Sequence, residues 1–361
     1  MDKKQMKNKF DLRALGLTVM LCVVAVLSAT DIEYGTHIIG HVLFMSLIGI
    51  LSVIYMTCEK AVFVLDAAAL LAIIFFTSKG SLMLSLFGVV IIGGALLLTF
   101  AIRKKSTKTS AVILVSFIVT AGYLIVMAVL YAAEGNSLEI SALFSKLNAF
   151  FDSIKTSFSE IIRQSVDSLP EEILANYAKY DITKEKLLEV SLHSMMAYVD
   201  WLQLILPGIF VFLVQVMGYI GTVSFEKTVR LMRYDAVLPE AHWYLYPTQI
   251  SCVIYILITT VYIITSFFTS TSSFAIIITN FWIALMPVMI ACGFRSLKLR
   301  LKHPQLRRRT VFVLILLGAG CFFIPDAVLT FGIFMLTFMG AQDVSLSRSM
   351  ESGGPRFKEK Q

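Results

Sequence analysis

Charged residues are scarce in this sequence. Only 15% of the 361 residues are Asp, Glu, Lys or Arg, whereas a soluble globular chain has about 25%. A soluble fold needs a polar outer surface, so most of the surface of this chain must face something other than water. The scarcity of charge therefore argues against an ordinary soluble domain.

Cysteine is also rare, and the five cysteines lie singly in or beside apolar segments. No pair has the CxxC spacing of a zinc site or a redox motif, and the series does not resemble a disulfide framework. We expect these residues to behave as small buried apolar side chains. They are Cys22, Cys58, Cys252, Cys292 and Cys321.

Familiar signatures of catalysis and nucleotide binding are missing as well. The sequence contains no Walker A motif, GxSxG, HExxH, GxGxxG or paired-carboxylate DDxxD repeat. Each of these motifs places a nucleophile, a metal ligand or a phosphate cradle at a fixed spacing that the chemistry requires. We therefore expect no catalytic residues, no cofactor and no metal site.

Long apolar blocks dominate the rest of the chain. Apolar residues make up 57% of it, and the mean hydropathy is +0.80. A block of about 18 apolar residues without period-two alternation is long enough to cross a bilayer as a helix. The sequence predicts an all-α, polytopic membrane helix bundle with about eight to ten such segments. They lie at 13–30, 37–57, 60–77, 81–102, 111–133, 201–222, 248–270, 273–293, 310–324 and 326–341.

Both ends of this series need comment. The first block follows four lysines as in a signal peptide, but Asp31-Ile32-Glu33 is a poor cleavage site, so we predict an uncleaved first span. The last two blocks are short and are separated by Pro325-Asp326. They could form a tight hairpin, a re-entrant pair or one long broken helix.

Lysine and arginine gather in alternate loops between the predicted spans. With a cytoplasmic N-terminus, the cytoplasmic segments hold 24 of the 31 basic residues, and the short outer loops hold only Lys79. Cytoplasmic loops of membrane proteins carry this excess of positive charge. We therefore predict that both termini are cytoplasmic and that the net charge of +7 reflects topology, not nucleic-acid binding. The basic loop Arg295–Arg309 is either a topological anchor or a contact for anionic lipid or a cytoplasmic partner.

One long segment, 134–200, is predicted to lie outside the bilayer. It separates an N-terminal membrane half, 1–133, from a C-terminal half, 201–343, and the tail 344–361 is expected to be disordered. Its apolar residues recur every three or four positions, which predicts an amphipathic helix. This loop could be a lid over a cavity, a docking surface for a partner, or a helical hairpin lying in the outer membrane interface.

Four side chains within predicted spans are candidate substrate-binding residues. Asp66 lies in an apolar run, where it could pair with a cationic substrate or take up a proton, or simply hydrogen-bond a neighbouring helix near the cytoplasmic end. Gln215 and Asn280 lie deep in their spans, where single amides usually join helices. Trp282 follows Asn280 closely.

Two other groups of polar residues are better explained by structure than by chemistry. Asp31, Glu33, His37 and His41 cluster on the outer side, and the two histidines share one helical face. Two histidines four residues apart can share a metal, but no firm third ligand accompanies them. Asp326, after Pro325, is expected to be an N-cap.

Three short motifs lie at characteristic places in the chain. A span contains Leu206-Pro207-Gly208 directly after the acidic amphipathic loop. The remaining motifs are Leu238-Pro239 preceded by Arg230, Arg233 and Tyr234, and a closing apolar segment that ends Gly340-Ala341-Gln342-Asp343 with Arg348 nearby.

This organisation resembles the YybS-like family of uncharacterised bacterial membrane proteins, the domain of unknown function 2232. That family is distantly similar to the substrate-capturing S components of energy-coupling-factor transporters. The resemblance implies a bacterial plasma-membrane protein with a helical ligand-binding core, and it implies a transmembrane subunit and cytoplasmic ATPases as partners besides the lipid bilayer. It implies no particular ligand.

Three functions can be compared on these grounds. We favour a substrate-binding or transport membrane subunit with a pocket near the outer face, covered by segment 134–200. The alternative is a non-transport scaffold or assembly factor in cell-envelope or sporulation processes, docking a partner on that segment. A membrane-embedded enzyme would need clustered acids or a metal triad, and the sequence offers little of either.

Overall fold

The computed structural model describes residues 3–34, 38–133, 135, 139–234, 237–238, 245, 249–268, 272–302, 304–323 and 325–342. Throughout these residues the regular structure is helical, as the all-α prediction requires. The helices are α1 (Lys3–Tyr34), α2 (Ile38–Thr57), α3 (Lys60–Thr77), α4 (Leu82–Arg103), α5 (Lys108–Ala133), α6 (Ile140–Asp167), α7 (Glu171–Ala178), α8 (Lys184–Leu231), α9 (Gln249–Phe268), α10 (Ser273–Lys302), α11 (Pro304–Phe323) and α12 (Pro325–Gln342).

Seven of these helices are long and apolar enough to cross a membrane: α1, α2, α3, α4, α5, α8 and α10. An 18-residue helix is about 27 Å long, close to the thickness of the hydrocarbon core. The other three predicted segments also form helices, but their apolar parts are shorter than the 18 residues needed to cross the hydrocarbon core. The apolar parts described for α9 and α12 cover only Ile250–Thr265 and Gly332–Ala341, and α11 carries Arg307–Arg309 near its start.

The last two predicted segments form separate helices. α11 ends at Phe323, α12 begins at Pro325, and the two helices contact each other while α12 packs along α10. Proline lacks a backbone N–H and fits the first turn of a helix, which explains why a new helix begins there. This arrangement is a hairpin, so the alternative of one long helix does not hold.

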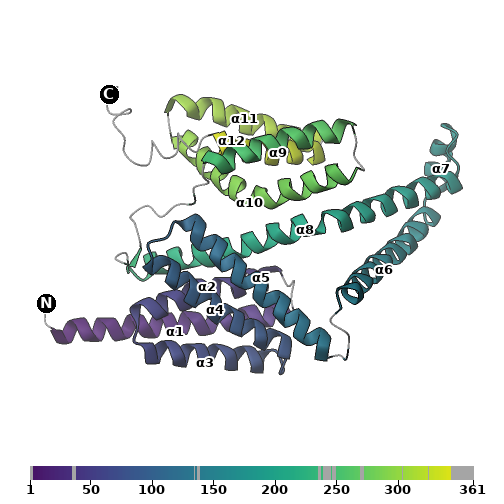
Figure 1. Ribbon diagram of the computed structural model, residues 1–361. Helices are drawn as coiled ribbons and strands as arrows, with labels where there is room; N and C mark the ends of the chain where they lie inside the picture. The colour runs from purple at the N-terminus through teal and green to yellow at the C-terminus, as the bar shows by residue number, and fades with distance from the viewer. Residues whose placement is uncertain are drawn as a thin grey trace.

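The helices form two lobes (Figure 1). The first lobe consists of α1 to α5 and the C-terminal half of α8, and the second consists of α9 to α12. Large buried side chains from several helices, such as Leu51 of α2, Ile91 of α4 and Phe225 of α8, fill the core of the first lobe. Tyr255, Trp282 and Met289 belong to the smaller core of the second.

α8 joins the two lobes. It packs against α2 and α5 of the first lobe and against α10 of the second, and Figure 1 shows it running between them. The predicted boundary at residue 201 between loop and span lies inside this one continuous helix. The predicted disordered tail, 344–361, lies outside the described residues.

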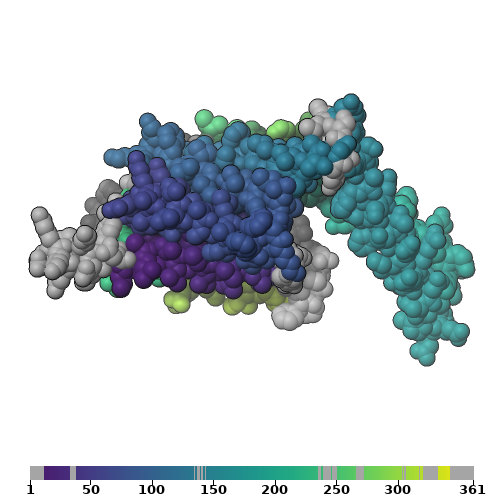
Figure 2. All heavy atoms as spheres, turned by 90° about the horizontal axis from the view of Figure 1, so that it is seen from below, coloured from purple at the N-terminus to yellow at the C-terminus, as the bar shows by residue number. Residues whose placement is uncertain are grey.

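α6, α7 and the N-terminal part of α8 form an arm that projects from the lobes (Figure 2). The predicted amphipathic segment is therefore helical, and its apolar face packs partly against α8. Phe151 of α6 and Val199 of α8 are buried. Two polar contacts add to this pairing: Lys155 Nζ lies 2.6 Å from Asp200 Oδ1, and Gln203 Nε2 donates to Asn148 Oδ1 over 2.7 Å.

Candidate functional site

A cavity of about 250 Å³ lies where the two lobes meet. Its walls come from α5, α8 and α10, with Leu245 from the connection between α8 and α9. Nearly all the lining is apolar, and Gln215 and Tyr219 supply the side-chain polar groups. The lining residues are Val112, Phe212, Gln215, Val216, Tyr219, Leu245, Pro287, Val288, Ile290, Ala291 and Phe294.

Each of the two long helices beside this cavity contains a proline. Pro207 lies inside α8 and Pro287 lies inside α10. A proline inside a helix has no N–H to donate to the carbonyl four residues earlier, and its ring crowds that carbonyl. The backbone of both helices is therefore weakened at these points, and unpaired polar groups there need other partners.

Asn280 of α10 contacts the α8 backbone next to Pro207. The Gly208 N–H donates to Asn280 Oδ1 over 2.7 Å, and Asn280 Nδ2 donates to the Leu204 carbonyl oxygen over 2.9 Å. In a regular helix the N–H of residue 208 would bond to the carbonyl of residue 204. The amide of Asn280 therefore holds, from outside the helix, the two backbone groups that form the first possible pair after Pro207.

Glycine at position 208 makes this contact possible. A Cβ at Gly208 would lie 2.8 Å from the Asn280 carbonyl oxygen and 2.9 Å from Asn280 Cα. These are backbone atoms of α10, which cannot move aside as a flexible side chain can. The close approach of α8 and α10 therefore depends on the absence of a side chain at this position.

Gln215 makes the matching contact in the opposite direction. Its Nε2 donates to the Ala284 carbonyl oxygen over 2.7 Å, one residue beyond the carbonyl that loses its partner to Pro287. Each helix thus supplies an amide to the proline region of the other. Gln215 also lines the cavity, so this pair of contacts forms part of the cavity wall.

A cluster of charged residues lies beyond the Tyr219 end of the cavity. Lys108 Nζ of α5 is 2.7 Å from Glu226 Oε2, and Arg230 Nη2 is 2.7 Å from the other carboxylate oxygen, Glu226 Oε1. Lys108 is only 5% exposed. Its Nζ also lies 5.7 Å from the ring centroid of Tyr219, within the range of a cation–π interaction. This buried ion pair joins α5 to α8.

Two of the four predicted binding residues, Gln215 and Asn280, meet at the α8–α10 interface. Asp66 lies elsewhere, buried between α1 and α3, where Thr18 Oγ1 donates to its Oδ2 over 3.1 Å. This contact agrees with the last of the roles predicted for Asp66, a hydrogen bond to a neighbouring helix. Gln215, Asn280 and Trp282 all lie on other helices, away from Asp66.

Trp282 faces away from the cavity. It lies two positions after Asn280, a rotation of about 200° around the helix, so the two side chains point to opposite sides of α10. Its ring stacks on Tyr262 of α9, with centroids 4.4 Å apart and planes 8° apart. Trp282 therefore belongs to the core of the second lobe.

The core of the second lobe also holds a group of polar residues, of which only Trp282 was a candidate from the sequence. Tyr255, Thr259 and Trp282 are buried, and none of their side-chain polar atoms forms a hydrogen bond within the described structure. Tyrosine and threonine occur in many apolar helices, so no sequence signal distinguished Tyr255 or Thr259.

The outer cluster of acids and histidines has a structural role where it is described. The Asp31 carboxylate accepts a hydrogen bond from the Gly40 N–H over 2.7 Å and so satisfies a free donor at the start of α2. His37 and the side chains of Glu33 and Asp326 lie outside the described residues. Within the described part of the chain, no three His, Cys, Asp or Glu side chains gather as metal ligands.

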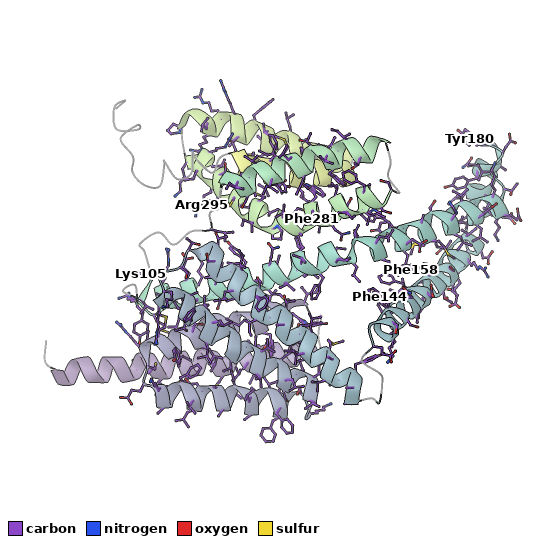
Figure 3. The ribbon with its side chains drawn as sticks, in the orientation of Figure 1. Lys105, Phe144, Phe158, Tyr180, Phe281 and Arg295 are labelled. Carbon is purple, nitrogen blue, oxygen red and sulfur yellow. The ribbon has the colours of Figure 1, made fainter. Side chains whose placement is uncertain are left out.

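The cavity does not lie under segment 134–200, where the sequence predicted a pocket. Along α8 it lies between the arm and Glu226, and none of the described residues of segment 134–200 lines it. The arm is therefore not a lid over this cavity, because the continuous α8 helix carries the arm away from it. Figure 3 shows Phe144, Phe158 and Tyr180 of the arm at the far end of the molecule from Lys105, with Arg295 beside the gap between the lobes.

Over the residues that the structure describes, these features define a class: an all-helical, two-lobed bundle with seven apolar helices of membrane-spanning length and an apolar cavity at the lobe junction. No protein-family model matches the chain, and no curated protein and no solved structure matches it significantly. The resemblance to the YybS-like family therefore stays a prediction.

Proposed function

We propose that the protein is an integral membrane protein that binds an apolar or amphipathic molecule in the cavity between α8 and α10, as a substrate-binding or transport subunit. The seven apolar helices support insertion in a bilayer. In this proposal the protein contacts the bilayer, and the resemblance to the YybS-like family adds a transmembrane subunit and ATPases as partners. We propose no catalytic activity, because the sequence carries none of the signatures of soluble enzymes named above.

The cavity is the observation that carries the proposal. Its volume of about 250 Å³ exceeds the roughly 150 Å³ of an engineered apolar cavity that binds benzene. A mostly apolar wall with a few polar groups is typical of ligand sites. The reciprocal contacts of Asn280 and Gln215 hold the two walls at a fixed separation without filling the space between them.

The distribution of charge supports the proposed orientation. Lys105 and Arg295 lie toward one end of the molecule and the arm at the other (Figure 3). Because positively charged loops stay in the cytoplasm, the arm would be extracytoplasmic. In this orientation the cavity lies in the cytoplasmic half of the α8 span.

Filling the cavity tests the proposal. Ala291→Trp would place an indole in the cavity, whereas Val211→Trp would add the same group at an exposed position on α8 that does not line it. Protein purified in mild detergent should carry a co-purifying small molecule, detected by mass spectrometry, that Ala291→Trp loses and Val211→Trp retains. Equal recovery from both variants would refute the proposal.

A second candidate function is a membrane scaffold that docks a partner on the arm. The observation in its favour is the row of large apolar side chains on α6 that α8 leaves uncovered: Phe144, Phe150, Phe158 and Ile161 are 44–61% exposed. Their spacing suits an apolar helix of an extracytoplasmic partner.

The scaffold function has a separate test. Changing Phe150 and Phe158 to Ser should abolish recovery of a partner protein after cross-linking in native membranes, while leaving the small molecule bound in the cavity. If the doubly substituted arm recovers the same proteins as the unchanged chain, the scaffold function is wrong.

A further inference from the structure

The arm is a hairpin of two antiparallel helices. Asn148 of α6 contacts Gln203 of α8, and Lys155, two turns further along α6, contacts Asp200, which precedes Gln203. Such a hairpin has two open sides, and a side chain lies on one of them when it is turned by about a quarter turn from the buried contact between the helices. The residues at those positions therefore decide what each open side presents.

One open side of this hairpin is apolar. Two groups of four residues, one on each helix, each fall within an arc of about 80° around the helix axis. Relative to the buried residues Phe151 of α6 and Val199 of α8, both arcs are turned in the same sense, which brings them to the same open side because the helices are antiparallel. We call this surface the arm face. It consists of Phe150, Ile154, Phe158 and Ile161 on α6 and of Ser191, Ser194, Tyr198 and Trp201 on α8.

The arm face is uncovered in the single chain and carries no charge. Its five largest exposed side chains are 40–59% exposed: Phe150, Phe158, Ile161, Tyr198 and Trp201. The Asp, Glu, Lys and Arg residues within 150–161 and 191–201 all fall outside the two arcs; they are Asp152, Lys155, Glu160 and Asp200. An exposed apolar patch of this kind marks a contact surface.

In the proposed membrane orientation the bilayer does not reach this face. α8 continues without interruption from its membrane span into the arm, and the part from Trp201 to Lys184 is roughly 26 Å long. Figure 1 shows α6 and α7 beyond the ends of the helices of both lobes. The arm thus points away from the membrane, and its apolar face meets water unless another protein covers it.

We propose that the arm faces of two copies of this chain pack against each other and form a four-helix bundle outside the membrane. Two copies in one membrane present their arms at the same height and in the same direction, so a two-fold axis along the membrane normal brings identical faces together. Each helix of the hairpin then has a second helix beside it, as in other four-helix bundles. Because the arm face is uncharged, no like charges meet there, and Asp152, Glu189 and Asp200 lie on the opposite side, turned to water.

The shape and the size of the face suit a second copy. In this arrangement α8 of one copy lies beside α6 of the other, and the small residues Ser191 and Ser194 are level with the large residues Ile161 and Phe158 of the second copy. A large aromatic side chain buries about 150–250 Å² in full, so the half-exposed side chains of the arm face offer roughly 500 Å² per copy. Two copies would bury roughly 1,000 Å², the area of a specific interface. The shared membrane also keeps the arms at a high local concentration.

The oligomeric state of the full chain tests this proposal. In an uncharged detergent the unchanged protein should be a dimer by light scattering. Phe158→Ser combined with Ile161→Ser should raise the dissociation constant of the dimer at least about tenfold, because apolar contacts are lost from both copies. The control combines Tyr177→Ser with Tyr180→Ser, two exposed residues near the tip of the arm and outside the arm face, and should keep the dimer. A monomeric unchanged protein, or a double variant that dimerises as well as the control, would overturn the proposal.

A charge swap separates a lost contact from a misfolded arm. Ser191 lies on the part of the arc nearest the groove between α6 and α8, so in a two-fold dimer it faces Ser191 of the second copy. Ser191→Glu and Ser191→Lys should each weaken the dimer when present alone, because like charges then meet across the axis. Co-expression of the two variants with different tags should restore a mixed dimer. If the oppositely charged pair is recovered no better than either variant alone, the arm faces do not meet.

The partner of the scaffold function is the other protein that could cover the arm face. Two differently tagged copies of the unchanged chain, cross-linked in native membranes, should be recovered together. Recovery of a different protein cross-linked to the arm face, without the second copy, would overturn the proposal. This test is independent of ligand binding, because none of the arm-face residues lines the cavity.

Discussion

Asn280 and Gln215 show how a single side chain can stabilise a helix to which it does not belong. Each amide bonds to the backbone of the opposite helix close to its proline. In an apolar environment a backbone group without a partner costs several kcal/mol, so these additional hydrogen bonds strengthen α8 and α10 directly beside their prolines. Pro207 and Pro287 can then persist inside helices that line a cavity.

Replacing Asn280 with Ala should lower the stability of the protein by about 1–2 kcal/mol. The substitution removes both the acceptor of the Gly208 N–H and the donor to the Leu204 carbonyl. Thermal unfolding in detergent would register the loss as a lower Tm. Asn176→Ala, which removes an exposed amide on α7, is the control and should leave Tm unchanged. An unaltered Tm for Asn280→Ala would mean that the α8 backbone does not need this amide.

Individual residues also mark the limit of what the sequence could predict. The deep amides were correctly expected to join helices, but their partners were unknown, because hydropathy says nothing about which helices are neighbours. Leu206-Pro207-Gly208 stood out as a family motif, and its role at the contact with Asn280 emerges only when α10 lies beside it. Lys108 was counted among the basic residues of a loop, whereas Glu226 holds it in a buried ion pair.

The helices themselves pair through contacts of very different character. α6 and α8 meet in the arm, exposed to water, through Phe151, Val199 and the ion pair between Lys155 and Asp200. α5 and α8 meet inside the first lobe at Gly218, without room for a side chain. The contact between α6 and α8 should therefore weaken when the pH changes the charge of Lys155. The contact between α5 and α8 should weaken when a larger side chain replaces Gly218.

High pH should loosen the arm. The hydrogen bond to Asp200 raises the pKa of Lys155 above its ordinary value of 10.5. A raised pKa means that the ion pair contributes fully below pH 10.5 and is lost as the pH rises through the pKa of the folded state. The distribution of distances between spin labels at positions 157 and 193 should broaden as the pH rises above 10.5. In Lys155→Met the distribution should not change with pH, and a transition that persists there would contradict this assignment.

A side chain at position 218 should separate α5 from α8. A Cβ at Gly218 would collide with Ser116 Oγ and would lie 2.8 Å from the Val112 carbonyl oxygen. Gly218→Val should therefore cost about 1–3 kcal/mol, the usual range for overpacking. A Cβ at Gly318 of α11 would have nothing within 4 Å of it, so Gly318→Ala is the matched control. A Tm for Gly218→Val equal to that of the control would show that the helices can move apart freely.

The whole molecule was predictable in class but not in arrangement. Ten apolar segments were expected and each forms a helix, because a long uncharged run has few other ways to satisfy its backbone. The arm was expected to be amphipathic and helical. The two-lobed packing and the continuity of α8 through Trp201 were not foreseen, and the hairpin of α11 and α12 was only one of three alternatives, since these features depend on contacts between residues far apart in the chain.

Orientation in the membrane can be tested on the intact protein. Cysteine introduced at Ser157 in the arm should react with a membrane-impermeant maleimide added to intact cells. Cysteine at Ser106, in the basic turn between α4 and α5, should react only after the membrane is opened. Labelling of position 106 but not 157 in intact cells would reverse the proposed topology.

The length of α8 has a mechanical consequence. Its 48 residues form a rod about 72 Å long, and Pro207, held by Asn280, lies near the middle. Roughly 34 Å of helix extends from that point to Lys184 in the arm, and roughly 28 Å extends to Glu226 at the opposite end. The part of α8 that ends at Glu226 is packed against α2 and α5, whereas the part in the arm packs mainly against α6. A sideways pull on the tip of the arm would therefore bend α8 at Pro207, where the helix lacks a hydrogen bond, and would leave the Lys108–Glu226 contact in place.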